Sequence, residues 1–341
     1  MRPQREIKMK YVVYVGHHKA FSGLRLGVRL AQNLAWNGNE VVLAGTKGKL
    51  PDYTGLRTIE FTAAATAKKL AEMLKKEGAE KVLSLTSLPI CEAAVLNKIP
   101  FVYCEPENFK EEKAVKNKKT ILKKAQKVVV LAQTGKPLDK KTYGANAVRV
   151  SNPAVWVEHL NHHRPDCFKK ENNILAFGKL TKTGGFDVLL KAWARLAVLH
   201  PSWHLTIVGD GPSKTSLKKL IEKNNLFSST EIIPAASDLY NLMSCADIYV
   251  SPAREEEALS ELLDAMASKL PVVASRVKGA EALVKHGVNG LLVGVDDEKN
   301  LADSLDQLMV DWGKRVGLAV EASHLRERYP FEAFMAFFEQ D

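Results

Sequence analysis

The sequence of 341 residues lacks any apolar run near the roughly 18–20 residues that a membrane-spanning helix needs. Its four cysteines lie far apart without Cys-x-x-Cys spacing, which argues against a zinc knot or a disulfide framework and fits a reducing compartment. The charged start MRPQREIKMK, followed by the short run YVVYVG, is typical of a first strand rather than a signal peptide. We therefore expect a cytoplasmic protein.

The charge is distributed unevenly along the chain. The net charge is +10, and basic residues outnumber acidic ones in 1–165, whereas acidic residues prevail in 166–341. A basic N-terminal half favours an anionic partner, such as a membrane surface, a phosphorylated acceptor or nucleic acid. Nucleic acid is the least favoured of these, because no recognition motif or aromatic interleaving accompanies the charge.

The basic charge is densest in 110–127, where eight lysines occur in eighteen residues. On anionic lipid each well-placed charge contributes about 1 kcal/mol, although a solvated helix face has the same composition. Five lysines are our candidates for contact with a membrane or an acceptor: Lys116, Lys118, Lys119, Lys123 and Lys124.

Short β-branched runs alternate with amphipathic helical stretches, and the alternation restarts after the polar segment 156–173. This pattern predicts an α/β fold with two facing Rossmann-like, doubly wound domains and a cleft between them, with ligands beyond the carboxyl ends of the strands. We expect an N-terminal domain at 1–165, a second domain at 166–320, and a C-terminal helix at 321–341 that crosses back to the N-terminal domain.

Two strand-to-helix loops in the second half have a composition suited to phosphate. AFGKLTKTGGFDVLLKAW places Lys179 and Lys182 on one loop, with Gly184 and Gly185 just before a helix. Cations and free N–H groups at a helix start bind a diphosphate, although an ordinary turn with solvated lysines fits as well. LTIVGDGPSKTSL supplies a tight turn through Gly209 and Gly211.

Together with SPAREEEALSELLDAMASKLPVVAS (251–275) and HGVNGLLV (286–293), these loops resemble the retaining glycosyltransferases of the two-Rossmann-domain (GT-B) type, family 4. That family commonly reads "GR-L---KG-D-LL-A", "IVGDGP", "PS--EGFG---LEAMA-G-PVVA" and "DG-NG-LV". The resemblance is dense over the C-terminal domain and thinner in the N-terminal half, at NEVVLAG and VRVSNPAVW.

The resemblance implies roles for two acids separated by seven residues. Glu256 would face the donor sugar and its phosphates, and Asp264 would hold the ribose hydroxyls, since a carboxylate accepts two hydrogen bonds from a diol. Taken alone, the segment is better explained as an amphipathic helix with an acidic first turn, which the helix dipole favours. In the N-terminal domain, Gly23 would let a loop approach the phosphates, and His17 or His18 are candidates for the acceptor site.

The sequence departs from the family at four positions. Lys179 replaces the phosphate-binding Arg and cannot form a bidentate fork. Gly184 occupies the usual Lys position, so that Lys182, two residues earlier, would have to substitute. Glu257-Ala258-Leu259 replaces Gly-Phe-Gly and would crowd the loop, and Asp264 is one methylene shorter than the usual Glu. The N-terminal domain also lacks the family's His after the strand in IPFVYCEPENF.

The resemblance implies a retaining hexosyltransferase that needs no metal and no cofactor besides its donor substrate, with a UDP-sugar favoured. The acceptor would be a glycan or a lipid-linked molecule at the inner face of a bacterial membrane, as in lipopolysaccharide core synthesis. No Asp-x-Asp metal motif is apparent, and Asp296-Asp297 reads as an N-terminal cap pair.

Two alternatives remain open. The first is a catalytically degenerate homologue that serves as a scaffold or partner subunit. The second is a two-domain nucleotide-sugar epimerase, which the absence of its histidine and acidic set disfavours. The sugar, the base, the acceptor and the oligomeric state are not encoded in a readable motif.

Overall fold

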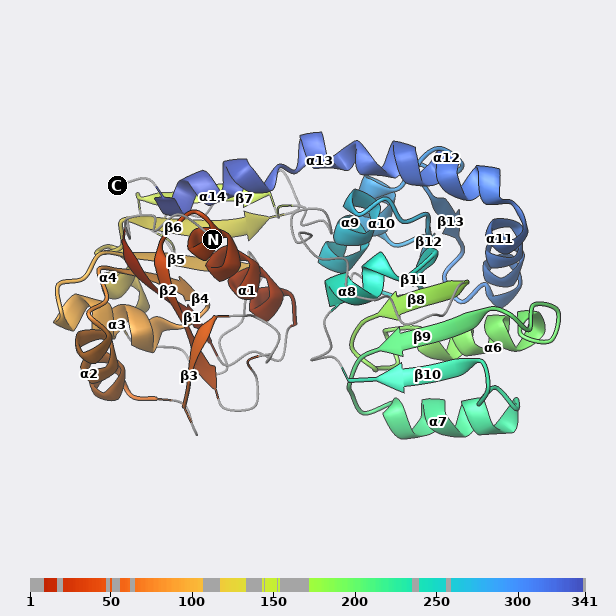
Figure 1. The fold of residues 1–341 in the computed structure, drawn as a ribbon, viewed down its shortest axis with the longest axis horizontal. Helices are drawn as coiled ribbons and strands as arrows, with labels where there is room; N and C mark the ends of the chain where they lie inside the picture. The colour runs from red at the N-terminus through yellow and green to blue at the C-terminus, as the bar shows by residue number, and fades with distance from the viewer. Residues whose placement is uncertain are drawn as a thin grey trace, which may run out of the picture. The chain divides into compact units, whose positions relative to one another are not determined.

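The chain forms two compact units, Met1–Pro153 with Phe331–Asp341, and Ala154–Pro330. The computed structural model describes residues 9–16, 21–46, 50, 56–61, 65–106, 117–132, 143, 145–151, 153, 172–234, 239–255 and 259–339. Each unit contains one parallel sheet with helices on both faces (Figure 1).

The first unit is built on a seven-stranded sheet in the order β3-β2-β1-β4-β5-β6-β7. Its strands are β1 (Lys10–Val15), β2 (Glu40–Thr46), β3 (Arg57–Phe61), β4 (Lys81–Leu85), β5 (Phe101–Pro106), β6 (Lys127–Ala132) and β7 (Ala147–Ser151). Its helices are α1 (Phe21–Trp36), α2 (Ala67–Glu77), α3 (Leu88–Leu96), α4 (Lys118–Leu122) and α14 (Phe331–Glu339). Val12 and Tyr14 share a core with α2 and α3, whereas α1 packs on the opposite face, where Gly27 lies against Val15.

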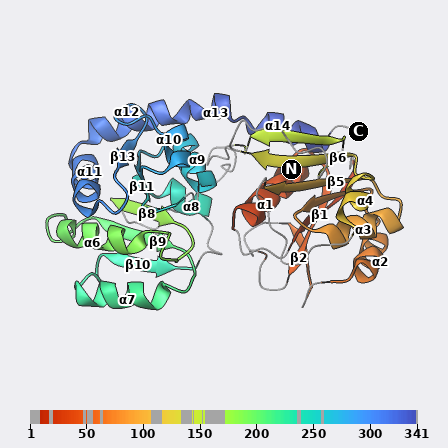
Figure 2. The ribbon, with the colours of Figure 1, turned by 180° about the vertical axis from the view of Figure 1, so that it is seen from behind.

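The second unit is built on a six-stranded parallel sheet in the order β10-β9-β8-β11-β12-β13. Its strands are β8 (Asn173–Phe177), β9 (His204–Val208), β10 (Thr230–Ile233), β11 (Ile248–Ser251), β12 (Val272–Ser275) and β13 (Leu291–Val293). Its helices are α6 (Phe186–Leu196), α7 (Lys214–Lys223), α8 (Leu239–Ser244), α9 (Leu259–Ala267), α10 (Lys278–Leu283), α11 (Glu298–Val310), α12 (Trp312–Ser323) and α13 (Leu325–Arg328). Trp193 of α6 and Leu305 of α11 share one core with Ile207, on the sheet face turned toward the viewer in Figure 2.

Both sheets are doubly wound, because the chain starts in the middle of each sheet, adds strands in one direction and returns to add the rest on the other side. The direction reverses between β1 and β4 in the first sheet and between β8 and β11 in the second. Ligands of such sheets bind beyond the carboxyl ends of the strands at this switch point. The prediction of two doubly wound Rossmann-like sheets is confirmed.

Some local predictions differ from the structure. Strand β3 was not expected, because RTIEF lies at the sheet edge with four of its five side chains at least partly exposed and carries no buried-strand pattern. The basic helix expected over 111–126 is described only as α4, since 107–116 lie outside the described residues. The whole of the short helix expected over 134–142 also lies outside them.

The C-terminal segment divides between the units. Residue 321 lies within α12, in the second unit, whereas Phe331–Asp341 belongs to the first unit. There the Lys127 ammonium of β6 lies 5.8 Å from the ring of Phe337 in α14, and Phe334 and Phe338 are buried. The boundary expected near 165 lies outside the described residues. In the described part of the chain, no helix combines the length and the apolar character needed to cross a membrane.

Candidate functional site

The candidate site is the carboxyl edge of the second unit's sheet, where three loops follow three adjacent strands. Residues 178–185 follow β8, residues 209–213 follow β9, and residues 252–255 follow β11. Because β8 pairs with both β9 and β11, these loops are neighbours at the switch point.

Glycines let the three loops touch through their backbones. Gly185 has φ +70°, and a Cβ on it would lie 1.8 Å from the carbonyl oxygen of Pro252. Similarly, a Cβ on Gly209 would lie 2.1 Å from the carbonyl oxygen of Gly178, and one on Gly211 would lie 2.4 Å from that of Leu180. The sequence assigned these glycines to donor binding, and the structure gives them a packing reason of their own.

The loop after β8 closes on itself before α6 begins. The Gly184 N–H donates to both the carbonyl oxygen and the Oγ1 of Thr181, each at 3.2 Å, and Thr181 Oγ1 lies 3.0 Å from Thr183 Oγ1. The expected presentation of the Gly184 N–H to a phosphate is therefore not seen, because the turn uses this donor. The remaining backbone donors of the edge are the N–H groups in the first turn of α6, of which the Val188 N–H donates to the carbonyl oxygen of Gly185 at 3.0 Å.

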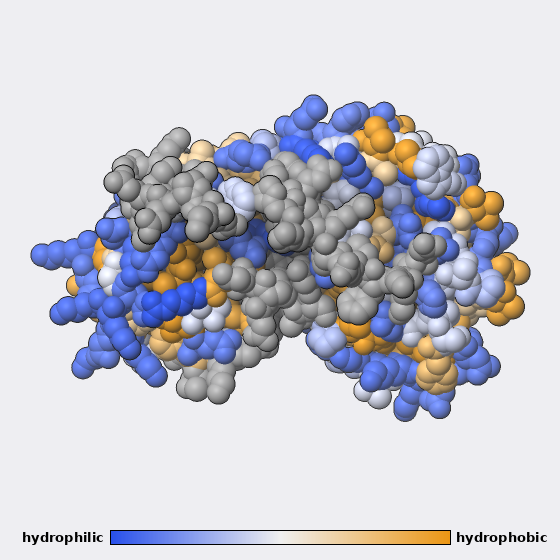
Figure 3. Space-filling model, in the orientation of Figure 1, coloured by the Kyte–Doolittle hydropathy of each residue, from blue (hydrophilic) through white to orange (hydrophobic). Residues whose placement is uncertain are grey.

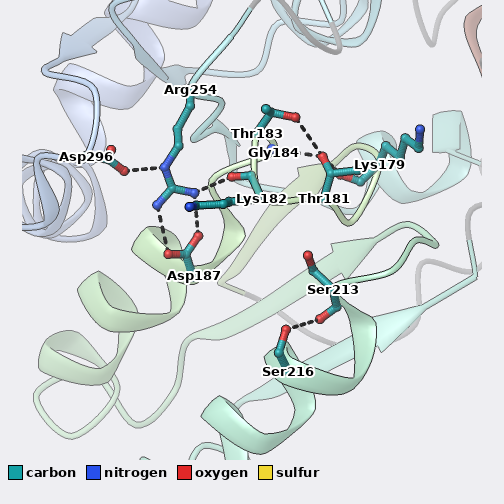
Figure 4. A network of polar contacts seen from close by, with 10 residues as sticks. All are labelled: Lys179, Thr181, Lys182, Thr183, Gly184, Asp187, Ser213, Ser216, Arg254 and Asp296. Atoms are coloured by element: carbon teal, nitrogen blue, oxygen red, sulfur yellow. Dashed lines mark hydrogen bonds and ion pairs between the residues drawn. The ribbon is translucent and has the colours of Figure 1, made fainter.

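The two lysines of this loop do not converge. Lys179 and Lys182 are both exposed, and Figure 4 shows their side chains leaving the loop in opposite directions. Lys182 extends to the side where Arg254 lies. The expectation that Lys182 substitutes for the family's second lysine therefore has no geometric support in this conformation, and Lys179 is the remaining candidate for the diphosphate.

Sequence reasoning missed Arg254, which joins three loops (Figure 4). Its guanidinium donates to Asp187 Oδ1 at 2.8 Å and to Oδ2 at 2.9 Å, and its Nε donates to Asp296 Oδ1 at 2.6 Å. The hydrogen bonds from Arg254 are the largest cause of the lowered pKa of Asp187, while partial burial opposes that shift. The available signal was an arginine inside an otherwise acidic loop.

The second acid of the motif lies on α9. Asp264 is 4% exposed and has a polar partner within the protein. Glu261, one turn earlier, is also buried and accepts a hydrogen bond from Ser260 Oγ at 2.8 Å. Glu256, together with 257 and 258, lies outside the described residues.

The structure accommodates Leu259, one of the residues that depart from the family pattern. Leu259, which replaces a family glycine, is the first residue of α9 and is 7% exposed. It packs against Gly279 of α10, where a Cβ would come within 2.2 Å of Leu259 Cδ1. The expectation that Leu259 crowds the sugar loop is therefore wrong, because its side chain is buried against α10.

The switch point of the first unit lies after β1 and β4. Thr86 has φ +64°, an unusual conformation for a β-branched residue, and its hydroxyl donates to the carbonyl oxygen of Leu85 at 2.5 Å. Gly23, which we expected on the strand-to-helix loop, lies in the first turn of α1 instead, because the helix begins at Phe21. His17 and His18 lie outside the described residues.

Lys118 differs from the other lysines of its segment, because its charge is used inside the first unit. Its ammonium lies 2.9 Å and 3.1 Å from the two carboxylate oxygens of the buried Glu105, which also accepts from the Tyr103 hydroxyl at 2.5 Å. The ammonium also lies 5.8 Å from the ring centroids of Tyr103 and Tyr143. The charge of Lys118 is therefore paired inside the first unit, and its contact with a membrane or an acceptor stays a prediction.

The other candidate lysines of this segment have no such buried partner among the described contacts. Lys119, Lys123 and Lys124 are exposed, and Lys116 lies outside the described residues. Figure 3 shows hydrophilic side chains gathered over the part of the first unit where Figure 1 places α2, α3 and α4.

The two acidic residues before α11, Asp296 and Asp297, have different partners. Asp297 is the N-cap of α11 and accepts from the Asn300 N–H at 3.0 Å, which confirms half of the expected cap pair. Asp296 is instead a partner of Arg254. Within the described ranges, no group of three or more His, Cys, Asp and Glu side chains could hold a metal ion.

Comparisons with known proteins match the second half of the chain to a family. Residues 160–323 match the model of "Glycosyl transferases group 1". An uncharacterized glycosyltransferase of Haemophilus influenzae is 27% identical over 313 residues, which cover 84% of this chain and 86% of that protein. The lipopolysaccharide core biosynthesis glycosyltransferase LpsE of Rhizobium meliloti is 27% identical over 146 residues, 43% of this chain and 42% of LpsE.

A solved structure supports the fold. HepE of Anabaena in complex with UDP-glucose aligns with a TM-score of 0.67 at 18% identity, covering 97% of this chain and 99% of that chain. Residues 160–323 therefore match the glycosyl transferases group 1 family, and the chain folds as two doubly wound Rossmann-like units of the GT-B type.

Proposed function

We propose that the protein is a retaining, metal-independent glycosyltransferase that moves a hexose from a nucleotide-diphosphate sugar to a glycan or lipid-linked acceptor. One observation carries this proposal: the loop with Lys179 and the start of α6 contact the loop that leads from β11 to Glu256, through Gly185 and Pro252. This brings a cation and the N-terminus of a helix beside the loop after β11 at a switch point.

The roles of the residues follow from the charge that develops in the reaction. Lys179 and the N-terminus of α6 stabilise the departing nucleotide diphosphate, Glu256 faces the sugar, and Asp264 holds the ribose. The acceptor hydroxyl attacks from the face that the diphosphate leaves, so the anomeric configuration is retained. His17 or His18 contributes to the acceptor site.

The descriptions of two similar proteins favour particular donor and acceptor classes. HepE was solved with UDP-glucose, which favours a UDP-sugar as the donor here. LpsE is named for lipopolysaccharide core biosynthesis, which favours a cell-surface glycan of a bacterium as the product. The exposed Lys119, Lys123 and Lys124 would hold the first unit on the anionic inner face of the membrane.

Calorimetric titration with UDP, GDP and ADP, and then with their sugars, tests the donor site. We expect micromolar binding of one nucleotide, weakened by Lys179→Met, Glu256→Ala and Asp264→Asn. Lys218→Met, at an exposed lysine of α7, is the control and should bind as the wild type does. Absence of binding to all three nucleotides would sink the proposal.

That negative result would favour the second candidate, a degenerate homologue that acts as a scaffold or partner subunit. The observation behind it is that Gly184 occupies the family's lysine position, that its N–H is used within the turn, and that Lys182 points away from Lys179. A scaffold of this kind would keep the fold and its glycan or protein partner without binding a nucleotide sugar.

Membrane association is tested by sedimentation with vesicles. The triple variant Lys119→Glu, Lys123→Glu, Lys124→Glu should lose binding to phosphatidylglycerol-containing vesicles but stay folded. The matched control replaces Lys218, Lys219 and Lys223, three exposed lysines of α7, with Glu. Equal loss in both variants would mean that net charge alone, and not this surface, drives the association.

A further inference from the structure

Arg254 contacts the loops after three different strands. It lies on the loop between β11 and α9, and its own N–H donates to the carbonyl oxygen of Thr183 at 2.7 Å. Its guanidinium donates to the carbonyl oxygen of Lys182 at 2.5 Å, to both oxygens of Asp187, and to Asp296 after β13. One side chain therefore ties the loops after β8, β11 and β13 together.

The contact between Arg254 and Asp187 is bidentate, which is the strongest arrangement of a guanidinium and a carboxylate. A bidentate guanidinium–carboxylate pair fixes orientation as well as distance, which a lysine cannot do. The side chain of Arg254 is 19% exposed, so its hydrogen bonds are partly shielded from water. The pKa of Arg254 is raised, chiefly by the hydrogen bond to Asp187, so the pair is ionised throughout the physiological range.

The position of Asp187 means that its pairing with Arg254 would affect the binding of an anion at the start of α6. Asp187 lies in the first turn of α6, next to the N–H groups that would receive a diphosphate. An unpaired carboxylate there would repel the phosphates, whereas Arg254 cancels its charge and holds it in place. In the sequence, Arg254 also lies only two residues before Glu256.

We propose that Arg254 is a positioning residue for the donor diphosphate. It holds the loop of Lys179 and the start of α6 in the geometry that receives the phosphates, and it neutralises Asp187 beside them. This inference rests on the proposed glycosyltransferase function for its ligand, but the tether itself does not depend on that function.

Hydrogen–deuterium exchange tests the tether without any ligand. In Arg254→Met, amides of 179–187 and 252–255 should exchange at least about tenfold faster, whereas those of β9 should not change. The matched control is Arg195→Met, which removes an arginine of α6 that pairs with Glu298 at 2.8 Å but does not contact these loops. Unchanged exchange at 179–187 in Arg254→Met would overturn the proposal.

Nucleotide titration tests the positioning role. Arg254→Met should weaken UDP binding by about tenfold or more, while uridine binding, followed by saturation-transfer NMR, stays as in the wild type. Arg254→Lys should recover only part of the UDP affinity, because it lacks the fork. Equal weakening of UDP and uridine would mean a general structural role and would overturn the inference.

The two proposals fail in different ways. If the wild type binds none of UDP, GDP and ADP, the donor site and the positioning of a donor diphosphate are both lost, and the exchange experiment still decides the tether. If the wild type binds UDP and Arg254→Met binds it equally well, the donor site stands and only the role of Arg254 is rejected.

Discussion

Gly185 and Pro252 meet backbone to backbone at the switch point of the second sheet. A Cβ on Gly185 would lie 1.8 Å from the carbonyl oxygen of Pro252, and Gly185 has φ +70°. Both the conformation and the contact therefore require glycine. The contact joins the two loops to which the donor phosphates and the donor sugar are assigned.

Gly185→Ala should destabilise the second unit and weaken nucleotide binding. The left-handed conformation costs about 1–2 kcal/mol for an L-residue, and relief of the overlap with Pro252 costs about 1–3 kcal/mol more. The control is Gly287→Ala, since Gly287 has φ +76° with no atom within 4 Å of an added Cβ, so that only the conformational cost remains. Urea denaturation measures both, and equal costs for the two variants would contradict the contact.

Lys118→Met should destabilise the first unit strongly, because it leaves the fully buried carboxylate of Glu105 without its cation. Breaking a buried pair in this way costs about 3–5 kcal/mol. Lys118→Met combined with Glu105→Gln should recover part of the loss, whereas Lys119→Met, at an exposed neighbour, should be nearly neutral. Denaturant titration measures each free energy of unfolding, and a neutral Lys118→Met would show that the pair is dispensable.

Asp187 should give the stability a specific pH dependence. Its pKa is lowered in the folded protein, chiefly by hydrogen bonds from Arg254, so the folded state binds fewer protons than the unfolded state around pH 4. The resulting stability is present above about pH 4 and is lost as the pH falls through the lower folded pKa. The difference in unfolding free energy between wild type and Asp187→Asn should therefore be largest near neutral pH and shrink in acid; a pH-independent difference would contradict this.

The described cysteines should differ in reactivity. Burial raises the pKa of the Cys91 thiol to about 12 and also raises that of Cys104, so both stay protonated in the folded protein. Cys245 is only partly buried. Maleimide labelling followed by mass spectrometry should therefore modify Cys245 before Cys91 and Cys104; labelling of Cys104 at the rate of Cys245 would contradict the burial.

Much of the fold could be predicted, because buried parallel strands are short β-branched runs and their helices have one apolar face. KVLSL and IYVS are fully buried strands that the pattern located. RTIEF was missed, because an edge strand with exposed side chains has no such run. The loop glycines could also be recognised in the sequence. Why glycine is required there could not, because the carbonyl oxygens that exclude a Cβ come from other segments of the chain.

The candidate site was only partly predictable, because some of its contacts join residues that are distant in sequence. Lys179, Gly185 and Asp264 lie in motifs that are contiguous in sequence, and the structure places Lys179 and Gly185 on the loop after β8 and Asp264 on α9. Lys182 was assigned to the diphosphate because it lies two residues before Gly184, which occupies the family's lysine position, but its side chain and that of Lys179 point in opposite directions. Arg254, Asp187 and Asp296 are far apart in sequence, so no local pattern could pair them.

The sequence by itself determined the alternation of strands and helices, the family that residues 160–323 resemble, and the loops that carry the candidate chemistry, because each of these is encoded in contiguous residues. Only the tertiary structure decided which charges are used internally. Lys118 of α4 pairs with Glu105 of β5, and Arg254 pairs with Asp187, 67 residues earlier, because strand order makes the segments after β8 and β11 neighbours. A short-range pattern specifies periodicity and turns, whereas the partner of a charged side chain depends on which strands become neighbours.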